Sequence, residues 1–119
     1  MKELTGKTAV ITGSGRDGGI GKGIALAFAD AGCNVVISDL GETNDPRFGE
    51  DHIGTTAEMT AIVQEAKIKG INAIGVPCDI RSETAVKNLV STTIESFGSL
   101  DILVNNAGVG FLMEPLVEF

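Results

Sequence analysis

The sequence has 119 residues, of which 43% are hydrophobic and 21% charged, and its 16 acidic and 9 basic residues give a formal net charge of -7. This composition is typical of one globular domain and excludes a disordered chain. Because there is no basic run, no signal-peptide core and no apolar run of membrane-spanning length, we expect a cytoplasmic protein that binds neither nucleic acid nor membranes.

The chain opens with a predicted strand, a glycine-rich loop and a helix. Residues 8–12 (TAVIT) form a short apolar and β-branched run, which is typical of a buried strand. From Ile20 to Ala31 apolar residues recur at helical spacing, and Gly32 follows where a C-terminal cap belongs.

The remaining residues repeat this alternation of strand and helix. Two further helices begin at cap signatures, Thr55 with Glu58 three residues later, and Ser82. The polar residues 41–54 are predicted to be an insertion or a mobile loop, with His52 in solvent. Further strands are predicted at residues 34–39, 72–78 and 100–105.

Alternating strands and amphipathic helices predict an α/β fold with a parallel sheet in the order 3-2-1-4 and helices on both faces. We expect one domain over residues 1–119 whose sheet stops after the fourth strand. In this order a switch point lies beside the first strand, where such sheets bind ligands at their carboxyl edge.

The two cysteines carry no sign of a metal site. Cys33 and Cys78 lie far apart in the sequence, and His52 is the sole histidine. Each cysteine flanks a predicted strand, so we predict buried, unreactive thiols and no bound metal.

The glycine-rich loop can be read in two registers as a dinucleotide-binding turn. Residues 13–18 (GSGRDG) are a literal G-x-G-x-x-G. In the second register, Gly13 turns off the strand, Gly19 allows backbone approach to a pyrophosphate, and Gly21 lets the helix pack closely. We favour the second register because the helical pattern begins at Ile20, which places the helix N-terminus at the phosphates.

An acidic residue ends the second predicted strand. The carboxylate of Asp39 can accept hydrogen bonds from the hydroxyls of an adenosine ribose and would repel a 2′-phosphate. This favours NAD as the cofactor. Arg16 in the loop carries the opposite charge and keeps NADP open as an alternative.

Four motifs in this order resemble the short-chain dehydrogenase/reductase family. The resemblance covers the whole chain, although the spacer between Gly13 and Gly19 is two residues longer than the family's common pattern. The motifs are Thr12-Gly13 with Gly19-Ile20-Gly21, Asp39 after the second strand, Asp79-Ile80 after the third, and Asn105-Asn106-Ala107-Gly108 after the fourth.

The resemblance implies a Rossmann-type dinucleotide-binding domain in an NAD(P)-dependent oxidoreductase. Such enzymes transfer a hydride between the nicotinamide and an alcohol or carbonyl group of a small molecule, which the sequence does not identify, and a homo-oligomer is expected for the complete enzyme. The expected cofactor-binding residues are Gly13, Ser14, Gly15, Arg16, Gly19, Ile20, Gly21, Asp39, Leu40, Asp79, Ile80, Asn105, Ala107 and Gly108.

No catalytic residue is assigned. The family uses a tyrosine as general acid and base, with a lysine that lowers its pKa and a serine and an asparagine that orient the substrate, and this sequence contains no tyrosine. We therefore expect residues 1–119 to be an incomplete domain, a fragment that holds the cofactor half, with exposed apolar surface where the sheet stops.

Two other functions remain as alternatives. Without the catalytic residues the chain could act as a non-catalytic nucleotide-binding or interaction module. Methyltransferases also pair a glycine-rich loop with an acid at the end of the second strand, but Thr12-Gly13 and the Asn-Asn-Ala-Gly turn disfavour that class.

Overall fold

A computed structural model describes residues 2–42 and 53–107 of the chain. Strands and helices alternate along it, as the sequence predicts. The elements are β1 (Thr8–Thr12), α1 (Ile20–Asp30), β2 (Asn34–Asp39), α2 (Thr56–Ile68), β3 (Ala73–Pro77), α3 (Glu83–Phe97) and β4 (Ile102–Val104).

The four strands form one parallel sheet in the order β3-β2-β1-β4, which confirms the predicted topology. β1 lies in the middle, where Val10 pairs with Val36 of β2 on one side and with Leu103 of β4 on the other. All five residues of β1 are buried, which explains its continuous apolar sequence.

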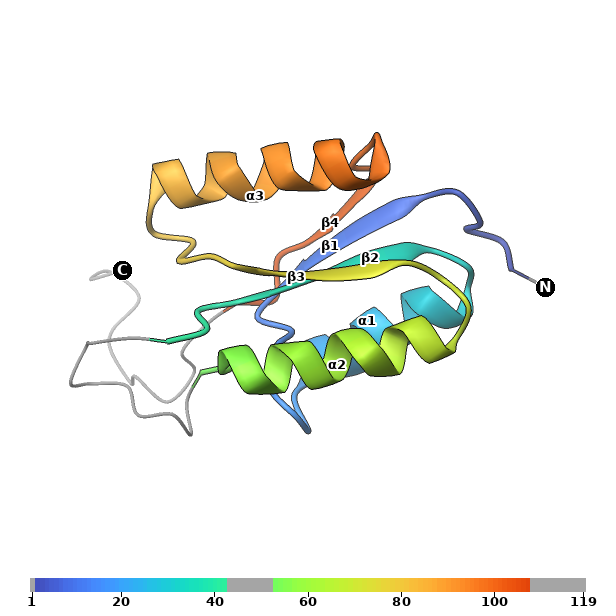
Figure 1. Ribbon diagram of the computed structural model, residues 1–119, viewed down its shortest axis with the longest axis horizontal. Coiled ribbons are helices and arrows are strands. Elements are labelled where there is room, and N and C mark those ends of the chain that lie inside the picture. The colour runs from blue at the N-terminus through green and yellow to red at the C-terminus, as the bar shows by residue number, and fades with distance from the viewer. Residues whose placement is uncertain (1, 43–52, 108–119) are drawn as a thin grey trace, which may run out of the picture.

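Helices cover both faces of the sheet (Figure 1). α1 and α2 pack on one face, around Ile11, Ile37 and Ile62, and α3 packs on the other, where Leu89 contacts the cluster around Val10. This distribution follows from the alternation of side chains along each strand, which sends successive residues to opposite faces.

The caps that mark the helix ends in the sequence are present. The Thr55 side chain accepts a hydrogen bond from the Glu58 N–H, and the Glu58 side chain accepts one from the Thr55 N–H, which completes the predicted capping box of α2. Ser82 accepts from the Ala85 N–H at the start of α3, and Gly98 ends that helix with φ of 82°. The two helices therefore begin where the sequence predicts.

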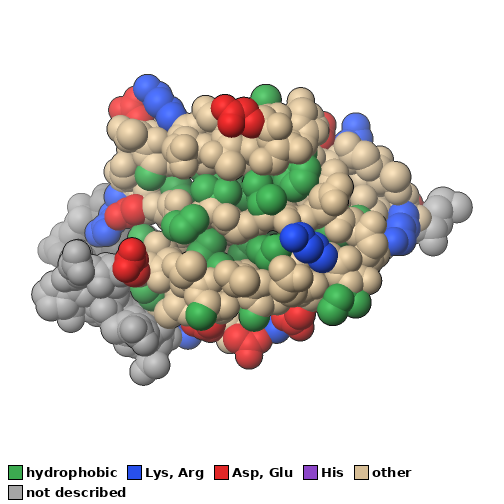
Figure 2. Space-filling view, viewed as in Figure 1, with side chains coloured by type: hydrophobic (Ala, Val, Ile, Leu, Met, Phe, Trp, Pro, Cys, Tyr) green, Lys and Arg blue, Asp and Glu red, His purple; other side chains and the backbone are tan. Residues whose placement is uncertain are grey.

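The fourth strand is shorter than predicted. Residues 100–105 are expected to be extended, but β4 runs only from Ile102 to Val104. Beyond Val104 the Asn106 N–H bonds the Thr12 side chain instead of the backbone of β1. Leu103, Val90 and Ile94 are 53%, 43% and 43% exposed, in agreement with the predicted apolar surface on β4 and the helix that covers this face. Hydrophobic side chains also lie between α3 and α2, above the opposite edge strand β3 (Figure 2).

Cys33 and Cys78 are both buried free thiols, as predicted. Burial raises the pKa of each thiol, and the nearby carboxylates of Asp101 and Asp79 raise it further. The uncharged thiol is therefore favoured at both positions, which is the state of a structural cysteine.

Within residues 2–42 and 53–107, no helix combines the length and apolar character needed to cross a bilayer. The same residues hold no cluster of three or more His, Cys, Asp or Glu side chains that is suited to a metal ion. The predicted loop position of His52 lies outside the described residues.

The carboxylate of Asp101 connects the start of β4 to β1. We expect this contact to make the free energy of unfolding decrease at low pH. Oδ2 accepts from the Thr8 N–H at 2.9 Å and from the Ser99 hydroxyl at 2.9 Å. These bonds, with the charge of Lys7, hold the pKa of Asp101 below its ordinary value of 3.8. A lowered folded pKa contributes stability that is present above the unfolded pKa and is lost as the pH falls through the folded value.

Urea unfolding from pH 7 to pH 2 would test this prediction. The Asp101→Asn variant should be less stable than the unaltered protein at pH 7, and the difference should shrink as the pH falls below 3.8. A difference that stays constant over this range would assign the contact no titrating contribution.

Candidate functional site

A cleft of about 490 Å³ opens at the carboxyl ends of the strands. Its position at the β1 switch point is the place where open α/β sheets bind ligands. The cleft is lined by Thr12, Gly13, Arg16, Gly18, Gly19, Ile20, Ser38, Asp39, Leu40, Ile53, Cys78, Asp79, Ile80, Arg81, Asn106 and Ala107.

The N-terminus of α1 faces this cleft without a side-chain cap. Gly19 is the N-cap residue and Ile20 the first helical residue, and the first turn contains no acidic side chain. The unpaired N–H groups and the positive end of the helix dipole are therefore available to an anion. The helix begins at Ile20, as the second glycine register predicts, and Gly21 lies in its first turn. Gly19 is the N-cap, directly before that turn.

Two glycines allow the loop, the helix and the end of β4 to meet closely. A Cβ atom on Gly21 would lie 2.5 Å from the Gly13 carbonyl oxygen and 2.6 Å from Nδ2 of Asn106. Gly13 has a φ of 66°, a conformation that side chains with a Cβ rarely adopt, and its own Cβ would lie 2.8 Å from the Cα of Ala107. Both positions require glycine.

Ser14 and Gly15 join the loop to β2 and lie beneath the cleft. The Ser14 hydroxyl donates to the Ile11 carbonyl at 2.6 Å and accepts from the Ser38 N–H at 3.1 Å. The Gly15 N–H donates to Oδ2 of Asp39 at 3.0 Å. Both residues are buried and neither lines the cleft, so they shape the loop from behind.

Asp39 is fixed at the end of β2 with its carboxylate in the cleft. One oxygen accepts from Gly15 and the other from the Leu40 N–H at 2.8 Å. Each carboxylate oxygen can accept more than one hydrogen bond, so the group retains capacity for donors from a ligand.

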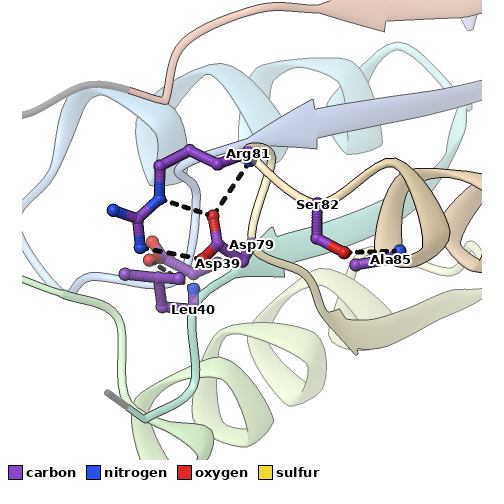
Figure 3. A network of polar contacts seen from close by, with 6 residues as sticks. All are labelled: Asp39, Leu40, Asp79, Arg81, Ser82 and Ala85. Atoms are coloured by element: carbon purple, nitrogen blue, oxygen red, sulfur yellow. Dashed lines mark hydrogen bonds and ion pairs between the residues drawn. The ribbon is translucent and has the colours of Figure 1, made fainter. Parts of the chain in front are cut away.

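A second acid faces the cleft from the end of β3. Asp79 is held by Arg81, whose backbone N–H and Nε donate to Oδ1 at 2.9 and 3.0 Å and whose Nη2 donates to Oδ2 at 2.8 Å. These bonds hold the pKa of Asp79 below its usual value. Figure 3 shows this pair beside Asp39, so two acids and one guanidinium lie together at the ends of neighbouring strands.

Thr12 joins the end of β1 to the turn after β4. Its hydroxyl oxygen accepts from the N–H groups of Asn106 and Ala107, each at 3.1 Å, and the hydroxyl donates to the Val104 carbonyl at 3.2 Å. The Asn106 side chain donates to the Gly13 carbonyl at 3.2 Å. The turn is thus attached to the glycine-rich loop.

The structure brings most of the predicted cofactor residues to one cleft. Ser14, Gly15 and Gly21 lie behind it, Asn105 is exposed and does not line it, and Gly108 lies outside the described residues. Those that line it are Gly13, Arg16, Gly19, Ile20, Asp39, Leu40, Asp79, Ile80 and Ala107.

Seven residues that line the cleft are not among the expected cofactor-binding residues, although Thr12 and Asn106 belong to the motifs of the family resemblance. Asn106 and Arg81 had local signals, since the first neighbours the predicted Ala107 and the second lies two residues from the predicted Asp79. Ile53 had no local signal, because it lies far in sequence from the other lining residues and shortly before the start of α2. The missed residues are Thr12, Gly18, Ser38, Ile53, Cys78, Arg81 and Asn106.

Comparison with known proteins assigns this geometry to a family. The family model described as enoyl-(acyl carrier protein) reductase matches residues 13–119. The 3-oxoacyl-(acyl-carrier-protein) reductase FabG of Staphylococcus aureus is 34% identical over 103 residues, which cover 87% of this chain and 36% of that protein. L-fucose dehydrogenase of Oryctolagus cuniculus is 41% identical over 113 residues, which cover 95% of this chain and 33% of that protein.

A solved structure shares both the fold and part of the sequence. Carveol dehydrogenase from Mycobacterium avium, crystallised in complex with NAD, superposes with a TM-score of 0.81 at 27% identity, over 100% of this chain and 42% of that one. The chain therefore spans about a third of the length of the curated relatives it matches. Since the family model covers nearly all of the sequence and the strand order agrees, the chain belongs to the short-chain dehydrogenase/reductase family.

Proposed function

We propose that this chain binds the nicotinamide dinucleotide of an oxidoreductase that interconverts alcohol and carbonyl groups, with NAD(H) preferred over NADP(H). The observation that carries the proposal is the carboxylate of Asp39, which is fixed in the cleft opposite the uncapped N-terminus of α1. A dinucleotide offers matching groups, an anionic pyrophosphate and a ribose diol.

The residues present fit such a cofactor. The N–H groups at the start of α1 would hold the pyrophosphate, since Gly19 permits close backbone approach and Gly13 and Gly21 leave no Cβ in the turn. Ile20 and Ile80 are 78% and 49% exposed in the cleft, which suits contact with an apolar ring face. When bound, the nicotinamide would supply or accept the hydride.

The two acids would take different parts of the adenosine. Asp39 would accept from the ribose hydroxyls, while Asp79, held by Arg81, would accept from the amino group of adenine. Arg16 and Arg81 also line the cleft and offset these negative charges. An anionic cofactor can therefore enter a cleft that contains two carboxylates.

Titration of the full-length protein with NADH and NADPH, followed by nicotinamide fluorescence, tests the proposal. We expect tighter binding of NADH. In the Asp39→Asn variant the affinity for NADH should fall about tenfold or more, because a charged acceptor of the ribose hydroxyls is lost, and the affinity for NADPH should rise.

Two outcomes would contradict the proposal. No binding of either dinucleotide to the folded protein would remove the proposed function, and an unchanged NADH affinity in Asp39→Asn would remove the role of this carboxylate. The Asp30→Asn variant is a matched control, since Asp30 is an exposed acid at the end of α1 that lies outside the cleft.

The family likeness alone supports the proposals for the substrate class and the oligomer. We propose a small alcohol or carbonyl compound as substrate and a homo-oligomer as the complete enzyme. The curated relatives named above include a reductase of an acyl-carrier-protein substrate and a fucose dehydrogenase, so the family likeness does not select one substrate class. No residue of this chain is proposed as a catalytic acid or base.

A further inference from the structure

The geometry points to Glu58 of α2 as a positioning residue that holds the glycine-rich loop in its cofactor-binding conformation. This inference rests on the proposed function. It concerns a residue that does not line the cleft and that acts through the backbone of the loop.

The carboxylate of Glu58 makes two separate sets of contacts. Oε1 completes the capping box, accepting from the Thr55 N–H at 3.4 Å and from the Thr55 hydroxyl at 3.3 Å. Oε2 accepts from the N–H of Asp17 in the glycine-rich loop at 2.9 Å. One side chain therefore caps α2 and binds the loop, and the loop contact is the shorter one.

The loop also packs on the start of α2 without hydrogen bonds. A Cβ atom on Gly54 would lie 2.5 Å from the backbone carbon of Gly15, and a Cβ on Gly15 would lie 2.6 Å from the Met59 side chain. These contacts place the loop directly against the first residues of α2. A small displacement of this end of α2 would therefore reach the loop.

A salt bridge adds a third connection between the same elements. The ammonium group of Lys22 on α1 lies 2.5 Å from the Asp17 carboxylate and 3.0 Å from Glu65 on α2. The loop, α1 and α2 are thus joined through one ammonium group. Because Asp17 is exposed, water weakens both this charge pair and the hydrogen bond to Glu58, so the loop is held by these contacts together with the packing on α2.

The residue held by Glu58, Asp17, lies within the part of the loop that enters the cleft. Asp17 lies between Arg16 and Gly18, both of which line the cleft, and Gly19 follows as the N-cap of α1. The loop is two residues longer here than the common family pattern, so more backbone must be ordered when a dinucleotide binds. Holding the Asp17 N–H in advance reduces that entropic cost.

Two variants separate the loop contact from the helix cap. Glu58→Ala removes both the capping-box acceptor for Thr55 and the acceptor for the Asp17 N–H. Thr55→Ala removes the cap acceptor for the Glu58 N–H and leaves Oε2 in place for Asp17. Both should lower the stability of α2, and only the first should release the loop.

The experiment is an NADH titration of the full-length protein and both variants, together with hydrogen exchange at the Asp17 amide without cofactor. Glu58→Ala should weaken NADH binding roughly fivefold to tenfold and speed Asp17 exchange, and its melting temperature should fall about as far as that of Thr55→Ala. Thr55→Ala should lower the melting temperature and leave the NADH affinity unchanged.

Equal NADH affinity in Glu58→Ala and the unaltered protein would overturn the inference while leaving the proposed function intact. Failure of the unaltered protein to bind NADH would overturn the proposed function and the effect on affinity. In that case equal Asp17 exchange in the two proteins would also overturn the loop contact itself, whereas faster exchange in Glu58→Ala would support that contact.

Discussion

The Gly21→Ala variant is expected to lose about 3 kcal/mol of folding free energy and to bind NADH too weakly to measure. Three atoms lie within 3.0 Å of the position that the added methyl would occupy, and two of them, the Gly13 oxygen and the Ser14 Cα, belong to the backbone. Neither can rotate away as a flexible side chain would. The first turn of α1 must therefore separate from the loop that it helps to form.

The same helix provides the control for this substitution. Gly23 lies two residues further along α1 and is exposed, and no described atom beyond its own stretch of helix lies within 4 Å of the position of an added methyl. Gly23→Ala should stabilise the protein by about 0.5 to 1 kcal/mol, because alanine loses less backbone entropy on forming a helix. Urea unfolding of both variants gives the comparison, and equal stabilities would contradict the close approach at Gly21.

The second large effect is expected for Thr12→Val. Valine has nearly the shape of threonine but cannot accept hydrogen bonds, so the N–H groups of Asn106 and Ala107 would lose their shared acceptor. Each unpaired, partly buried donor costs about 1 to 3 kcal/mol, and we expect a total loss of about 2 to 4 kcal/mol. NADH affinity should also fall, since both residues line the cleft.

The Thr12→Ser variant distinguishes the contribution of the hydroxyl from that of the methyl group. Serine retains the acceptor and the donor, so its cost should stay near 1 kcal/mol, roughly the value of one buried methyl group. Thermal unfolding and NADH titration would be compared for both variants. If Thr12→Ser were as unstable as Thr12→Val, packing rather than hydrogen bonding would hold the turn to β1.

The sequence predicts the fold well because its signals are local. The β-branched runs, the capping box at Thr55 and the terminal Gly98 each depend on residues within a few positions of one another, and all are found where expected. The strand order follows from chain connectivity and the handedness of parallel crossovers. The C-terminal end of β4 was missed because a long-range contact to Thr12, rather than local preference, determines it.

The site is predicted less completely for a related reason. Asn105 and Asn106 are identical in chemistry, and only the register at the end of β4 decides that Asn106 lines the cleft and Asn105 does not. Ile53 lines the cleft together with the glycine-rich loop, which lies far from it in sequence. The contact from Glu58 to Asp17 also joins residues about forty positions apart. Spacing in one sequence carries no information on such contacts, whereas Asp39 and the glycines occupy positions fixed by the connection between strand and helix.

Pro77 makes the two edges of the sheet, β3 and β4, unequal in their ability to pair with another strand. In β3 the Cys78 N–H points inward to the Asp39 carbonyl, so the preceding residue directs its nitrogen to the outer side of this edge strand. A proline there removes one of the N–H groups that β3 would offer to an incoming chain, which is one way in which edge strands discourage accidental pairing. The apolar edge at β4 has no proline within Ile102–Val104, so a further strand is received more readily on that side.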